Sequence, residues 1–126
     1  MSKREVKHPD RATSTGAYSD GVIVDGWLHI SGQGPLDLKT GEVISGSIEE
    51  EVRLTMSHIG RILAAAGCSF DDVVKCTCYL ADIRDFDAFN RVYAEFFCGI
   101  RPARTTVQAE LGGIRVEIDA VARVRK

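Results

Sequence analysis

The sequence predicts an α+β domain in two layers, a mixed β-sheet with two helices packed on one of its faces. Two long segments carry apolar residues at helical spacing, and five shorter β-rich runs lie around them in the order β-β-α-β-α-β-β. Helices of similar length beside such strands indicate a two-layer architecture. The 126 residues, 44% of them hydrophobic, suit one domain over 1–126 with a single core.

The first two strands form a predicted hairpin. Residues 1–16 are polar and are expected to be irregular. The runs 22–24 and 27–31 are rich in β-branched and aromatic residues, and Asp25-Gly26 joins them as a two-residue turn. The glycine- and proline-containing segment 32–35 is expected to end the second strand.

The first helix begins after Ser47. Glu50 stands three residues later and completes a capping box. Gly67 is expected to end the helix. Its apolar stripe recurs every three or four residues, at Ile48, Val52, Met56, Ile59, Leu63 and Ala66.

A strand over 73–80 precedes the second helix, which is predicted from about Asp85 to Phe97, with Asp82 as a candidate cap. Its apolar stripe consists of Phe86, Phe89, Tyr93, Phe96 and Phe97, with Asn90 at the edge. Two last strands, 104–111 and 115–123, are separated by Gly112-Gly113.

Both helices on one face leave the other face of the sheet without cover from its own chain. The last strand alternates apolar residues with side chains such as Glu117 and Val121, so both faces need partial burial. An uncovered, partly apolar face of this size predicts an oligomer.

Composition excludes several classes of function. The formal net charge is −2 and the basic residues are spread along the chain, which argues against nucleic-acid binding. No apolar segment follows the N-terminus, and the longest apolar run, 62–68, is too short for a membrane helix, so a cytoplasmic protein is expected. The four cysteines, Cys68, Cys76, Cys78 and Cys98, lack metal or redox spacing and are expected to be reduced and buried; no metal site is predicted.

Two charged residues stand in strands that otherwise look buried, Arg104 and Glu117. Burying an unpaired charge costs several kcal/mol, so each needs a partner or a purpose. A guanidinium offers a planar fork of donors to a carboxylate, and a carboxylate can accept a proton from water. The pair indicates chemistry on a small carboxylic acid; the structural alternative is an ion pair of Arg104 with Asp119 or Glu117.

Motifs along nearly the whole chain, from about His8 to Val124, closely resemble the reactive intermediate deaminase family, also called the RidA or YjgF family. These motifs are Gly16-Ala17-Tyr18-Ser19, Ser31-Gly32-Gln33-Gly34-Pro35-Leu36-Asp37, Thr40-Gly41-Glu42-Val43, Asp71-Asp72-Val73-Val74-Lys75, Asn90 with Tyr93 and Phe96-Phe97, Pro102-Ala103-Arg104, and Val116-Glu117-Ile118.

The resemblance implies a chorismate-mutase-like fold, a homotrimer with clefts between its subunits, and hydrolysis of enamines and imines such as 2-aminoacrylate and 2-iminopropionate to 2-keto acids and ammonia. It implies that Arg104 binds the substrate carboxylate and Glu117 positions or activates water. The implied pocket residues are Tyr18, Ser31, Gly32, Asn90 and Thr106. For Tyr18 and Asn90 a packing or loop-bonding role stands as the alternative, and Ser31 is expected to be a strand-end hydroxyl, because no base is visible for a nucleophile.

The chain departs from the family pattern at Ala17, Asp20 and Gly34, and its loop before Glu117 is about two residues shorter. Gly34 leaves open a larger substrate such as 2-aminomuconate. A non-catalytic trimer that binds small carboxylates or proteins is the second alternative. The family's endoribonuclease label fits poorly with the charge balance and with the lack of a histidine pair for acid–base cleavage. Imine hydrolysis requires no metal or organic cofactor.

Overall fold

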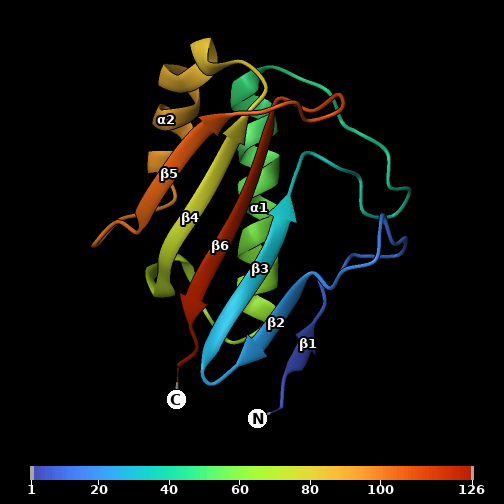
Figure 1. Cartoon of the computed structure of the whole chain (residues 1–126), viewed down its shortest axis with the longest axis vertical. Helices are drawn as coiled ribbons and strands as arrows, with labels where there is room; N and C mark the ends of the chain where they lie inside the picture. Colours follow the sequence, from blue (N-terminus) through green and yellow to red (C-terminus); the bar gives the residue numbers. More distant parts are fainter. Residues whose placement is uncertain (1, 126) are drawn as a thin grey trace.

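The protein has two layers, a six-stranded mixed sheet and two α-helices on one of its faces, so the predicted α+β class is confirmed (Figure 1). The structure, a computed structural model, describes residues 2–125. The strand order is β1-β2-β3-β6-β4-β5. The elements are β1 (Arg4–Val6), β2 (Gly21–Val24), β3 (Trp27–Gln33), α1 (Ile48–Ala65), β4 (Val73–Leu80), α2 (Phe86–Ala94), β5 (Ala103–Gln108) and β6 (Val116–Arg123), with short 3₁₀ turns at Phe70–Asp72 and Ile83–Asp85.

The N-terminal region departs from the prediction in two places. Residues 4–6, expected to be irregular, form β1 at the sheet edge, where Val6 is the one buried residue of a strand too short to show alternation. The predicted hairpin of β2 and β3 is present, with positive φ angles at Asp25 and Gly26. β3 does not stop at Gly32 but continues to Gln33, with a register shift between Ile30 and Gln33.

α1 begins and packs as its sequence predicts. Ser47 accepts the backbone N–H of Glu50, and the Glu50 carboxylate accepts that of Ser47, which completes the capping box. Gly67, just past the end, has a φ of +74°. The apolar stripe lies on the sheet, and the side chains Val52, Met56, Ile59, Ile62 and Leu63 are buried. No helix within residues 2–125 is long and apolar enough to cross a membrane.

α2 is shorter than predicted. Asp82 caps the preceding 3₁₀ turn through the backbone N–H of Arg84, and the α-helix itself starts at Phe86. It ends at Ala94 rather than Phe97, because the last N–H groups bond to carbonyls three residues back, as those of Phe96 and Phe97 do.

The last two strands are not neighbours. β4 lies between them, parallel to β5 and antiparallel to β6, so no hairpin forms across Gly112-Gly113. Both strands are also slightly shorter than expected, because β5 ends at Gln108 and β6 starts at Val116. This order puts β5 at one edge of the sheet and β6 in its middle (Figure 1).

The sheet face away from the helices is open in the single chain, as predicted (Figure 1). Apolar side chains such as Val74 and Val107 remain exposed. Cys76 and Cys78 both point into the core, and all four cysteines are free thiols. Cys98 contradicts the prediction, since it is exposed in the loop that follows α2.

Candidate active site

Arg104 lies at the junction of the edge strand β5 and helix α2. Its register partner on β4 is Cys76, a buried residue of the helix-facing side, so Arg104 also points toward the helices. Its Nη1 donates to Asn90 Oδ1 over 2.8 Å. The predicted alternative, an ion pair with Asp119 or Glu117, is wrong, and no carboxylate of residues 2–125 lies within ion-pair distance of Arg104.

Thr106 follows two residues after Arg104 and shares its side of the strand. Its partner Cys78 is fully buried. The Thr106 hydroxyl is buried and has no hydrogen-bond partner in the described chain. Asn90, Arg104 and Thr106 therefore form one group, which we call the arginine half-site.

Glu117 lies on the opposite side of the sheet. It pairs with Tyr79 and alternates with Val116 and Ile118, whose side chains are buried under the helices, so Glu117 projects from the open face. Gly32 of β3 lies directly beside it: a Cβ atom on Gly32 would stand 2.5 Å from Glu117 Oε2. A side chain at position 32 is therefore incompatible with the present place of the carboxylate.

Ser31 joins this group to the loop before β2. Its backbone N–H donates to the Asp20 carbonyl over 2.9 Å, and its hydroxyl donates to the Ser19 carbonyl over 2.6 Å. The hydroxyl thus holds a loop and has no basic partner, as expected of a strand-end serine. We call Ser31, Gly32 and Glu117 the glutamate half-site.

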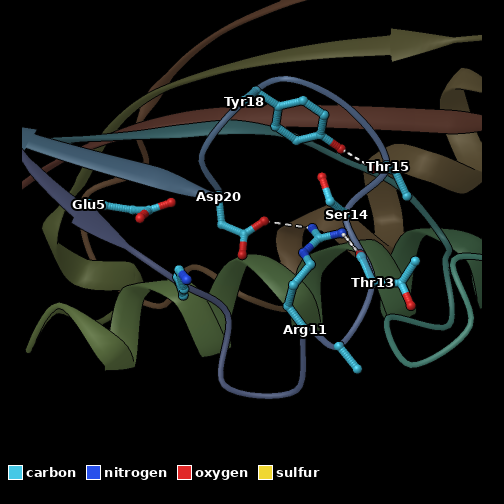
Figure 2. Close-up of a pocket in the computed structure, with 9 residues that line it drawn as sticks. Glu5, Arg11, Thr13, Ser14, Thr15, Tyr18 and Asp20 are labelled. Carbon is cyan, nitrogen blue, oxygen red and sulfur yellow. Dashed lines mark hydrogen bonds and ion pairs between the residues drawn. The ribbon is translucent and has the colours of Figure 1, made fainter.

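Tyr18 lies on the loop that Ser31 anchors. Its side chain is 49% exposed, and its hydroxyl is hydrogen-bonded to Thr15. This loop lines a polar hollow of about 340 Å³. Figure 2 shows Tyr18 on one side of it and the ion pair of Arg11 and Asp20 on the other. A half-buried ring whose hydroxyl has a partner matches the packing alternative for Tyr18, and its pocket role stays a prediction.

The surroundings of Glu117 change its acidity. Burial raises its pKa above the ordinary value, and the nearby charge of Asp119 raises it further. Arg104, whose charge would favour the ionised form of Glu117, leaves the sheet on the other face. A raised pKa makes the carboxylate a stronger base, which suits it to accept and return a proton.

The two half-sites cannot meet in one chain. β4 separates β5 from β6, and the side chains of Arg104 and Glu117 leave the sheet on opposite faces. The structure therefore brings Asn90, Arg104 and Thr106 together, and separately brings Ser31, Gly32 and Glu117 together. Tyr18 lies on the loop whose Ser19 carbonyl accepts from Ser31.

Two features of the surroundings were not predicted. The rings of Phe86, Phe89 and Tyr93, assigned to the core from their spacing, also face the Arg104 guanidinium, at 5.4, 5.3 and 4.8 Å from the ring centroids. His8 and His58 form a buried hydrogen-bonded pair, with 3.1 Å between Nε2 and Nδ1. For the rings around Arg104, their helical spacing was the only signal in the sequence. For the histidine pair no local signal exists, because His8 and His58 lie 50 residues apart.

Comparisons with known proteins agree over almost the whole chain. The family model described as Endoribonuclease L-PSP matches residues 9–124. A human 2-iminobutanoate/2-iminopropanoate deaminase is 44% identical over 97% of this chain and 90% of its own length.

Solved structures show the same fold. The yeast protein YEO7 superposes with a TM-score of 0.91 at 32% identity, over 98% of this chain and all of its own. TdcF of E. coli, with bound serine, has a TM-score of 0.87 at 31% identity, over 98% of this chain and 99% of its own. The resemblance drawn from the motifs is confirmed, and the chain belongs to the endoribonuclease L-PSP family, the RidA/YjgF group that includes these imine deaminases.

Proposed function

We propose that the protein hydrolyses small reactive enamines and imines, of the 2-aminoacrylate and 2-iminopropionate type, to 2-keto acids and ammonia. Its relatives at 42–45% identity are named for this activity. The site contains the two groups that the reaction needs, a cation for the carboxylate and a carboxyl group for the proton transfers.

The observation that carries the proposal is the unpaired charge of Arg104. Its side chain is half-buried, yet within residues 2–125 its only hydrogen-bond partner is the neutral amide of Asn90. A half-buried guanidinium without a counter-ion favours an anionic ligand, and its planar fork matches a carboxylate.

We also propose that the working site forms between two subunits of a homotrimer. The arginine half-site of one subunit would face the glutamate half-site of the next, because the two half-sites of a single chain cannot contact the same substrate. The open sheet face, with exposed Val74 and Val107, supplies the surface for such an assembly. Cyclic symmetry would then repeat the cleft three times.

The chemistry follows from these positions. Arg104 holds the substrate carboxylate and so orients the imine carbon. Water adds to that carbon, the electron pair of the C=N bond moves to nitrogen, and Glu117 passes one water proton to the nitrogen. In the resulting carbinolamine, Glu117 takes the hydroxyl proton and delivers it to the amine. The C–N bond then breaks, and the keto acid and ammonia leave.

The surroundings of Gly34 favour a small substrate over a larger one such as 2-aminomuconate. A Cβ atom on Gly34 would stand 2.9 Å from Ile114 Cδ1, so the space beside this glycine is filled by the isoleucine side chain. The small imino acids therefore remain the proposed substrate class.

A coupled assay tests the proposal. A pyridoxal-phosphate threonine dehydratase generates the imine from serine or threonine, and its decay is followed with and without the protein. We expect faster decay with the wild type and background decay with Arg104→Ala. A wild type that binds pyruvate in calorimetry but leaves imine decay unchanged would favour the non-catalytic carboxylate-binding trimer.

A further inference from the structure

Arg104 is surrounded by a single stripe of α2. Phe86 stands three and four residues before Phe89 and Asn90, and these stand four and three residues before Tyr93, which places all four along one face. The three rings face the guanidinium and the amide oxygen accepts from its Nη1. One face of a nine-residue helix thus supplies every contact of the charged group named above.

The rings attract the cation without neutralising its charge, which an acidic residue would do. A guanidinium within about 6 Å of an aromatic face is attracted by the electrons of the ring, and the attraction grows when water is excluded. Phe89 is fully buried and Tyr93 nearly so, so water is excluded beneath the cation. Aspartate or glutamate in their place would neutralise the charge and occupy its N–H groups, which would compete with an incoming carboxylate.

The hydrogen bond to Asn90 determines which donors remain free. It uses an N–H of Nη1, and in the described residues Nε and Nη2 of Arg104 donate to no group. Nε–H and one Nη2–H form the parallel pair that a carboxylate accepts in a two-pronged contact.

We propose that Phe86, Phe89 and Tyr93 are positioning residues for Arg104: they hold the guanidinium plane so that its free Nε/Nη2 edge is presented to the substrate carboxylate. The identity of that ligand rests on the proposed deaminase function. The positioning itself is a property of the free protein and is measurable without any ligand.

The aromatic cluster contains a matched control. Phe97 packs against Tyr93 with ring centroids 4.9 Å apart, and it is 7% exposed against 5% for Tyr93. Phe97 is not among the rings that face Arg104. Tyr93→Leu and Phe97→Leu therefore remove a similar buried ring, but only the first removes a ring from beneath the cation. Phe86→Leu is a milder second test, because Phe86 is only partly buried.

The first measurement is the NMR order parameter of the Arg104 Nε–H bond in the ligand-free protein, with the resonance assigned by its absence in Arg104→Lys. We expect the order parameter to fall in Tyr93→Leu and Phe86→Leu, to recover in Tyr93→Phe, and to stay at the wild-type value in Phe97→Leu. Equal order in all of these proteins would overturn the proposal, as would an equal fall in Phe97→Leu.

The second measurement is the affinity for pyruvate by calorimetry. Immobilising a loose arginine on binding should weaken the affinity about 3- to 10-fold in Tyr93→Leu and leave it unchanged in Phe97→Leu. The same weakening in both variants would mean that the rings only pack in the core, and it would contradict the positioning role. A wild type with an ordered Arg104 but no pyruvate binding and no imine turnover would refute the proposed function and leave the positioning role standing.

Discussion

Lowering the pH below 7 should destabilise the fold through two buried histidines, His8 and His58. The hydrogen bonds assign their tautomers. The backbone N–H of Asp10 donates to His8 Nδ1, so His8 carries its proton on Nε2 and donates to His58 Nδ1. His58 then donates from Nε2 to the Leu36 carbonyl over 2.8 Å. Both rings must be neutral, because an added proton leaves two donors facing each other.

The size of the effect follows from the pKa values. Burial, with the neighbouring His58 and Arg61 as smaller causes, lowers the pKa of His8 from 6.5 to about 4, although Asp10 and Asp20 oppose the shift. Burial also lowers the pKa of His58. Between the folded and unfolded values only the unfolded chain binds the proton, so stability falls as the pH falls through this window. His8 alone should cost about 2 kcal/mol between pH 7.5 and pH 5.

Urea unfolding followed by circular dichroism, at one protein concentration and several pH values in this range, measures the loss. The double variant His8→Asn/His58→Gln should show a flatter profile than the wild type. The acidic groups with lowered pKa values, such as Asp82 at about 2, lose their contribution to folding stability only at lower pH. Parallel profiles for the wild type and the double variant would refute the reasoning.

Other substitutions separate the roles of the site residues. Arg104→Ala should lose pyruvate binding and imine turnover together, and Arg104→Lys should restore little, because a point charge cannot make the two-pronged contact. Glu117→Gln should keep pyruvate binding in calorimetry but turn over about 10²–10⁴ times more slowly; full activity would exclude it as the base. Gly32→Ala should displace the Glu117 carboxylate and lower turnover while pyruvate still binds; wild-type turnover would contradict the contact. Cys78→Ala should reduce the free energy of unfolding by about 1–2 kcal/mol and leave turnover of the folded protein intact; loss of activity in a folded variant would implicate the thiol.

Local patterns predicted the helices well. The Ser47–Glu50 capping box and the stripe around Met56 lie within one segment, so neighbouring residues suffice to predict α1. The end of α2 was placed three residues late, because aromatic residues continue at apolar spacing through Phe97 while the hydrogen bonds tighten. β1 was missed because three residues, two of them exposed, carry no periodic signal.

The sequence pattern could not predict how distant segments are placed relative to one another. Arg104 and Glu117 were correctly singled out as charges in strands, but the face on which each projects depends on strand order and register. β4 lies between β5 and β6, and its register with each of them puts Arg104 beside Cys76 and Glu117 beside Tyr79, on opposite faces. The pair of His8 and His58 depends in the same way on where β1 and α1 meet.

Mixing two inactive variants tests the intersubunit site most directly. Arg104→Ala and Glu117→Gln chains are unfolded together in equal amounts, refolded, and assayed for imine decay. If each site takes its arginine from one subunit and its glutamate from the next, a random trimer has about a quarter of its sites intact, so about a quarter of wild-type activity should return. Activity no higher than that of the separately refolded variants would contradict a site shared between subunits and, with it, the proposed arrangement of the two half-sites.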